Sequence, residues 1–229
     1  MNIRSTAVLG LLLAAVAPLG LADDDDDDGD QGKARYQVTV TNATHDQRFT
    51  PILVAAHDER VRLFAVGQPA SVELATLAEE GNTAPLAALL AASRGVHGIA
   101  TSSGLLEPGQ TATVVVDGRS QDQISLAAML IPTNDAFVAV SGARVSGRRP
   151  EMLSAVAYDA GSEVNDELCA SIPGPGFDEC GGPGGGGSPF GGEEGFVHVH
   201  RGIHGVGDID PSRRDWRNPV ARVTIVRIR

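Results

Sequence analysis

Short runs that alternate between apolar and polar residues constrain this chain most. Residues 36–41 alternate with a period of two and are rich in β-branched side chains, which is typical of a half-buried strand. The 28 glycines and 13 prolines interrupt the chain too often for long helices. The pattern predicts an all-β fold, an antiparallel two-sheet β-sandwich. The other runs with strand character are residues 49–55, 61–64, 111–116, 124–130, 137–140, 196–200 and 220–228.

One stretch has helical composition instead. Residues 71–80 and 83–92 are rich in Ala, Leu and Glu, Ser71 and Thr83 stand where N-caps belong, and Gly81 follows the first run as a stop. We therefore expect a short helical insertion on the sandwich.

The N-terminus carries an export signal. Residues 1–22 combine a short positive start, an apolar centre and small residues at a cleavage position, which is typical of a secretory signal peptide. The apolar run is shorter than the roughly 20 residues that a membrane span needs, and no later segment is apolar enough to span. The mature protein is expected to be secreted, or periplasmic or at the cell surface, without a transmembrane segment.

An acidic tract follows the signal. Residues 23–33 contain seven aspartates, whose mutual repulsion predicts a disordered linker, and residues 34–229 then form a single domain. The tract contributes much of the net charge of −11, and the remaining chain is mildly acidic. This balance argues against nucleic acid as a partner, because phosphates require a basic face, and it favours cations.

A Gly/Pro-rich loop spans residues 174–192, and two cysteines flank its first part. In an exported chain with only two cysteines, a disulfide between Cys169 and Cys180 is the expected state. Their spacing is not that of a C-x-x-C redox motif.

The first candidate site is a set of carboxylates after strand-like runs. Asp135 follows one run, and Asp159 and Glu163 follow another, with Gly161 allowing a sharp turn between them. Carboxylates and loop carbonyls are the hard oxygen ligands that calcium requires. The alternative is that these acids are solvated turn residues.

The second candidate site consists of histidines. His198 and His200 point to one face of a strand, and His204 follows in the next turn, so three imidazoles could hold zinc or copper. The alternative is that the rings hydrogen-bond neighbouring loops.

Signatures of catalysis are missing from the sequence. One tryptophan and two tyrosines are too few for the aromatic platforms of a glycosidase cleft, and no Gly-x-Ser-x-Gly elbow occurs. We expect a protein that is not an enzyme.

Together these segments resemble the spondin N-terminal domain family. The most specific motifs are Thr133-Asn134-Asp135 and Asp159-Ala160-Gly161, and the His-x-His run is typical of the bacterial secreted branch. The family also includes the animal matrix proteins F-spondin and mindin. The segments that carry the resemblance are residues 36–42, 49–55, 132–137, 158–167, 198–205 and 215–223.

The resemblance implies a β-sandwich like that of calcium-dependent phospholipid-binding modules, a bound calcium ion and an adhesive role. In the animal members, one Asp after a strand and two Asp in an Asp-Ala-Gly-Thr-Asp stretch hold the ion. These positions fall on Asp135, Asp159 and Glu163. The chain departs from that pattern where Glu163 replaces Asp and Ser162 replaces Thr.

The sequence thus predicts a secreted, non-catalytic calcium-binding module that contacts an extracellular surface or matrix component. The alternative is a small secreted metalloenzyme, or a zinc- or copper-binding protein, that uses His198, His200 and His204.

Overall fold

The strands follow the alternation of the sequence. The computed structural model describes residues 32–173, 179–180 and 191–229, which belong to one compact unit, Gly32–Arg229. The predicted signal peptide, residues 23–31 of the predicted linker and most of the Gly/Pro-rich loop lie outside the described residues. The strands are β1 (Lys33–Asn42), β2 (Arg48–Phe49), β3 (Leu53–His57), β4 (Val96–Thr101), β5 (Thr111–Arg119), β6 (Gln123–Ile131), β7 (Ala136–Arg144), β8 (Glu151–Asp159), β9 (His198–Val199) and β10 (Ala221–Arg227).

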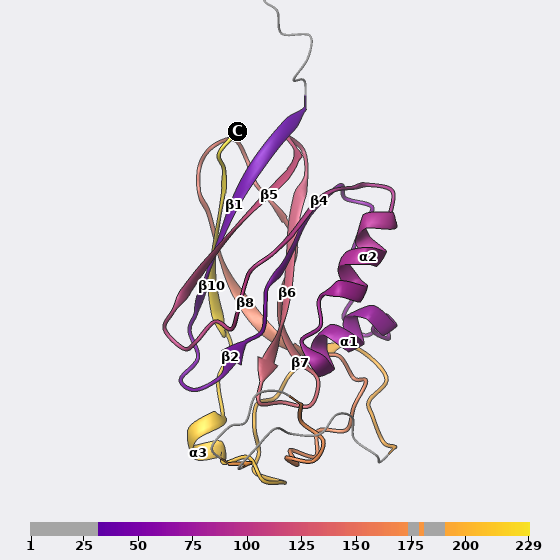
Figure 1. Cartoon of the computed structure of the whole chain (residues 1–229), viewed down its shortest axis with the longest axis vertical. Coiled ribbons are helices and arrows are strands. Elements are labelled where there is room, and N and C mark those ends of the chain that lie inside the picture. Colours follow the sequence, from indigo (N-terminus) through magenta and orange to yellow (C-terminus); the bar gives the residue numbers. More distant parts are fainter. Residues whose placement is uncertain (1–31, 174–178, 181–190) are drawn as a thin grey trace, which may run out of the picture. The chain divides into compact units, whose positions relative to one another are not determined.

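The strands form one antiparallel sheet in the order β4-β3-β6-β7-β8-β10-β1-β5, with β2 paired to β6 and β9 paired to β8 (Figure 1). The two ends of this order approach each other, since β4 packs against β5. At Gly98 in β4, an added Cβ would overlap the carbonyl oxygen of Asp117 in β5. The sheet is therefore nearly closed.

The prediction of antiparallel β-structure is confirmed, but the two-sheet sandwich is corrected to a single curled, barrel-like sheet. Alternation shows which face of a strand is buried, and it does not show how far a sheet curls. Register shifts at Ala56/His57 and at Ile124/Leu126 bend strands β3 and β6, as bulges do in closed sheets.

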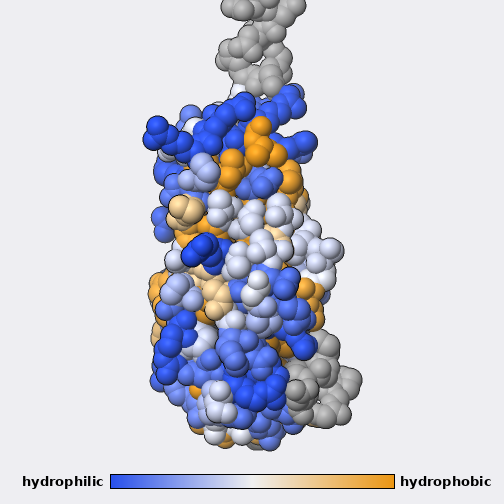
Figure 2. All heavy atoms as spheres, turned by 90° about the vertical axis from the view of Figure 1, so that its left-hand side faces the viewer, coloured by the Kyte–Doolittle hydropathy of each residue, from blue (hydrophilic) through white to orange (hydrophobic). Residues whose placement is uncertain are grey.

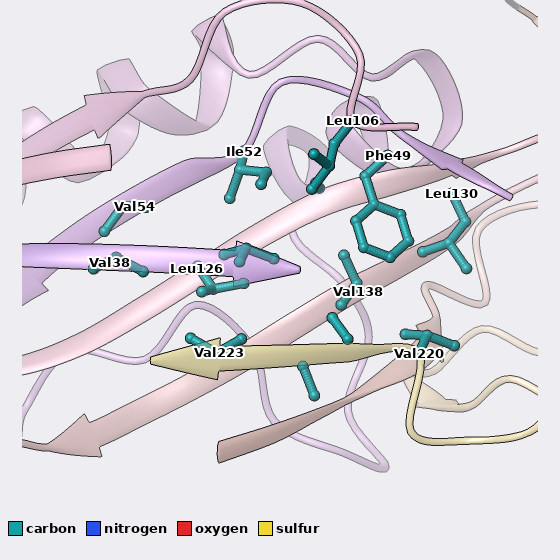
Figure 3. Packing of buried hydrophobic residues seen from close by; sticks show 14 of the residues in the cluster. Val38, Phe49, Ile52, Val54, Leu106, Leu126, Leu130, Val138, Val220 and Val223 are labelled. Atoms are coloured by element: carbon teal, nitrogen blue, oxygen red, sulfur yellow. The ribbon is translucent and has the colours of Figure 1, made fainter. Parts of the chain in front are cut away.

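Side chains on the concave face of the sheet form the main core. In β1, Tyr36, Val38 and Val40 are fully buried, while the residues between them are less buried. Figure 3 shows Val38 of β1 and Val223 of β10 among the packed apolar side chains of this core. The face in Figure 2 is largely hydrophilic, with smaller apolar areas, as the alternation predicts.

Helices α1 (Val72–Glu80) and α2 (Ala84–Ala92) cover the other face of β3, β6 and β7 (Figure 1). Leu77 of α1 and Leu86 of α2 lie in a second apolar cluster with Phe137 of β7. For this reason β6 is buried along nearly its whole length rather than on alternate residues. The predicted helical insertion is confirmed.

The helix ends follow the predicted capping in part. The Ser71 hydroxyl accepts a hydrogen bond from the backbone N–H of Leu74 at 3.2 Å. Thr83 makes no such bond. Nearby, the amide oxygen of Asn82 accepts a hydrogen bond from the backbone N–H of Ala84 at 3.1 Å.

Three further differences from the predicted elements occur. Residues 61–64 form no strand. Instead, Leu63 lies in the apolar cluster that contains the side chains of helices α1 and α2. Strand β4 and the one-turn helix α3 (Pro211–Arg214) were not predicted, whereas β8 is the strand-like run expected before Asp159. In the part of the chain that the structure describes, none of the helices is long and apolar enough to cross a membrane.

Candidate metal site

The acidic and histidine motifs meet at one end of the sheet, opposite the C-terminus (Figure 1). The strand register explains this convergence. In the pairing of β7 with β8, Ala136 lies opposite Asp159, and in that of β8 with β9, Asp159 lies opposite His198. The backbone N–H of Ala160 donates to the carbonyl of Asp135 at 3.1 Å. Residues that are far apart in sequence are therefore adjacent in space.

The Thr133-Asn134-Asp135 turn, which precedes β7, is hydrogen-bonded to the acidic loop that follows β8. The Thr133 hydroxyl donates to the carbonyl of Leu130 at 2.6 Å, which holds the turn. The Asn134 side chain donates to the Asp166 carboxylate at 2.9 Å and accepts from the backbone N–H of Glu167 at 3.2 Å. Asn134 thus positions the loop after β8.

Asp135 is a fully buried carboxylate. Its Oδ2 atom accepts from the backbone N–H groups of Ser162 and Glu163 at 2.8 and 3.0 Å. Its Oδ1 atom is buried and has no hydrogen-bond partner among the described residues. Burial and the neighbouring Asp159 carboxylate raise the pKa of Asp135 to about 8. This position therefore favours either a proton or a bound cation.

Asp159 lies at the centre of the cluster and is also buried. Its carboxylate accepts from the backbone N–H of Gly161 at 2.7 Å and from the Asn165 amide at 2.8 Å. Its oxygens lie 3.8 Å from His198 Nδ1 and 3.8 Å from His200 Nε2. Burial raises the pKa of Asp159 above its ordinary value.

Glu163 approaches Asp135 through its backbone, and its side chain is buried. The three predicted calcium ligands therefore occupy one loop cluster. The described residues contain one set of three metal-type ligands whose donor atoms all lie within 4.8 Å of one another, namely Asp159, Glu194 and His198. Asp135 and Glu163 border this set. Glu194 was not predicted, because it follows a Gly-rich segment with no spacing typical of a ligand.

The three predicted histidines have different surroundings. His200 is buried; its Nδ1 accepts from the backbone N–H of Gly202 at 3.0 Å and its Nε2 lies 3.2 Å from the Asn165 amide oxygen. Burial lowers the pKa of His200 to about 3, so its ring is neutral. His204 is exposed. His200 and His204 line a depression of about 20 Å³ together with Asp159. The zinc or copper site made of the three histidines stays a prediction.

A family profile described as Spondin_N matches residues 38–162, more than half of the chain. The chain belongs to the Spondin_N family. No curated protein matches the chain. The match covers Asp135 and Asp159 and ends just before Glu163. Membership in this family supports an extracellular, non-catalytic module.

Beyond the matched segment, Glu167 orders the loop that carries the histidines in this spondin domain. Its buried carboxylate accepts from the backbone N–H groups of His204, Gly205 and Val206 at 2.6, 2.6 and 3.0 Å. The sequence does not reveal this role of Glu167, since a carboxylate bound to main-chain groups 37 to 39 residues away leaves no local pattern.

The disulfide of the spondin domain is confirmed. Cys169 and Cys180 are bonded, with their Cα atoms 5.4 Å apart. Beside Cys180, Glu179 forms a two-pronged ion pair with Arg214 of α3, at 2.7 and 2.8 Å. The disulfide loop is thereby tied to the segment that precedes β10.

Proposed function

We propose that this chain is an exported, non-catalytic module that binds calcium at its loop end and contacts an extracellular surface or matrix component through the same loops. Asp135, Asp159 and Glu163 would hold the ion, with loop carbonyls and water completing six to eight oxygen ligands. Membership in the Spondin_N family supports the extracellular role.

The observation that carries the proposal is the buried pair Asp135 and Asp159. Two neighbouring carboxylates repel each other, and Asp135 Oδ1 has no hydrogen-bond partner among the described residues. A hard dication would remove the repulsion and supply the missing partner. The residues present therefore fit the ion that the family resemblance implies.

The first experiment measures melting temperature with calcium and with EDTA. A ligand that binds the native form at about 100 times its Kd adds about 2.7 kcal/mol, which for a domain of this size is roughly 5–10 °C. In Asp135→Asn this calcium response should disappear, while the melting temperature in EDTA should not fall, since a carboxyl group that burial makes hard to ionise is replaced by a neutral amide of the same shape.

The control is Glu193→Gln, because Glu193 is an exposed carboxylate near the site. It should keep the full calcium response, and Glu163→Gln should lose most of it. A calcium response that persists in Asp135→Asn would contradict the proposed ligand set.

The adhesive role has its own test. Binding of the purified chain to immobilised extracellular matrix should require calcium and be lost in Asp135→Asn. Equal binding in EDTA would separate adhesion from the metal and overturn this part of the proposal.

A further inference from the structure

Glu194 is placed beside Asp159 by backbone contacts of the residues that follow it. The N–H of Gly195 donates to the carbonyl of Gly161 at 2.9 Å. Val197 is held in turn by Gln68 and Gly67, through two backbone hydrogen bonds of 2.8 Å. The segment that carries Glu194 is therefore fixed against the turn that follows β8.

The surroundings of Glu194 suit a bound cation. Its Oε2 atom is buried and has no hydrogen-bond partner among the residues that the structure describes. Donor atoms of Glu194, Asp159 and His198 all lie within 4.8 Å of one another. Glu194 as a whole is half-buried, but this buried oxygen, next to a second carboxylate and an imidazole, would be stabilised by a positive partner.

The donor set differs in kind from the calcium set. One imidazole nitrogen and two carboxylate oxygens suit a first-row transition ion such as zinc, whereas calcium takes oxygen ligands. Tetrahedral zinc with bonds of about 2.1 Å places its ligand atoms about 3.4 Å apart. Since the three donor atoms lie within 4.8 Å of one another, binding requires side-chain shifts of up to about 1.4 Å and no change of fold.

The carboxylate of Asp159 is already oriented for such a role. Gly161 and Asn165 hydrogen-bond it at 2.7 and 2.8 Å, as outer partners commonly do for ligating carboxylates. His200 is less suited, because its ring nitrogens face Gly202 and Asn165. His198 and His200 both lie 3.8 Å from the Asp159 carboxylate, but His198 is the one whose donor atom also lies within 4.8 Å of Glu194. Its Nδ1 atom lies 3.3 Å from the carbonyl oxygen of Phe196, a contact that metal binding at this atom would replace.

We propose that Asp159, Glu194 and His198 form a binding site for a divalent transition ion, with zinc as its probe, next to the calcium ligands and sharing Asp159 with them. This site goes beyond the proposed function and does not depend on calcium binding. It also differs from the three-histidine set, since it contains neither His200 nor His204.

The test is calorimetric titration of the full chain with zinc, after treatment with EDTA and its removal. The unaltered chain should bind one zinc ion at this site. His198→Gln and Glu194→Gln should each weaken binding more than about tenfold, and Asp159→Asn should abolish it.

Matched controls come from the same segments. His204→Gln changes an exposed histidine six residues along the chain, and Glu193→Gln changes the exposed neighbour of Glu194. Both should bind zinc like the unaltered chain. Loss of zinc binding in either control, or its retention in His198→Gln, would overturn the site.

The calcium response and zinc binding of the same variants distinguish the transition-ion site from the calcium site. His198→Gln should keep the calcium response, which also shows that the variant is folded, and Asp135→Asn should keep zinc binding. If the unaltered chain does not bind zinc, the proposed transition-ion site is wrong and the calcium site is unaffected. If the chain shows no calcium response, the calcium site is wrong and the transition-ion site is unaffected.

Discussion

The turn after Asp159 depends on a single glycine. Gly161 has a φ of +65°, and an added Cβ would lie 2.6 Å from the backbone nitrogen of Phe196. This close approach brings the segment with Glu194 and His198 against Asp159. Gly147 has a similar φ of +68°, but an added Cβ there meets nothing within 4 Å.

The two glycines give a matched pair of variants. Gly161→Ala should lower the free energy of unfolding by about 3 kcal/mol, because it combines left-handed backbone strain with overlap against fixed main chain. Gly147→Ala should cost about 1 kcal/mol, from strain alone. Chemical denaturation measures both, and equal losses would show that the contact with Phe196 does not matter.

Sequence patterns reveal individual site residues only where the chain brings them close together. Asp135 follows a strand, and Asp159 and Glu163 lie four residues apart around a glycine, so local patterns single them out; their role as calcium ligands stays a prediction. Glu167 and Glu194 act through groups that are distant along the chain. Their roles depend on strand register and loop packing, which no local pattern specifies.

Helix α3 is held in place by a buried ion pair. The guanidinium of Arg214 bonds both oxygens of Glu179, and these side chains are 4% and 8% exposed. Arg214 also donates to the carbonyl of Asp46 at 2.6 Å. The hydrogen bonds from Arg214 hold the pKa of Glu179 below its ordinary value of 4.5. The pair thus links α3, the disulfide loop and the turn after β1.

Glu179→Gln should lower the free energy of unfolding by about 2 kcal/mol near neutral pH, since it leaves a buried guanidinium with less compensation. The folded-state pKa of Glu179 is depressed, so its contribution is present above pH 4.5 and is lost as the pH falls below that value.

The measurement is urea denaturation of both chains between pH 7 and pH 3. The difference between the unaltered chain and Glu179→Gln should shrink below about pH 4.5. A difference that stays constant down to pH 3 would mean that the charge of Glu179 is not what stabilises α3.

A strand could be predicted from the sequence where one of its faces is buried and the other is exposed to solvent. In β1 and β10 the alternation is clear, and residues 36–41 and 220–228 were recognised as strands. In β4 every residue except the last is half-buried, and its sequence contains Gly98, so no alternation marks it. Residues 61–64 show the opposite error, because apolar residues there pack under the helices from a loop.

Strands β4 and β5 are the two ends of the strand order, and they are not paired by hydrogen bonds. The sheet closes because these two strands pack against each other. Gly98 permits this contact, since any Cβ would overlap the carbonyl of Asp117 and lie 3.2 Å from Val116. Because residues 96–101 were not recognised as a strand, Gly98 was not recognised as a glycine inside one, and a sandwich was expected. A glycine inside a strand is a general sign of such close backbone approach.

Gly98→Ala should therefore separate β4 from β5 and leave the other strand contacts in place. The main chain of β5 would have to move away, with a loss of roughly 3 kcal/mol in the free energy of unfolding. Hydrogen exchange should accelerate in β4 and β5 and change little in β7, which pairs on both sides far from the contact between β4 and β5. Gly191→Ala is the control, because an added Cβ there meets nothing within 4 Å. If exchange rises equally in all strands, the contact between Gly98 and Asp117 supports the sheet as a whole rather than closing it.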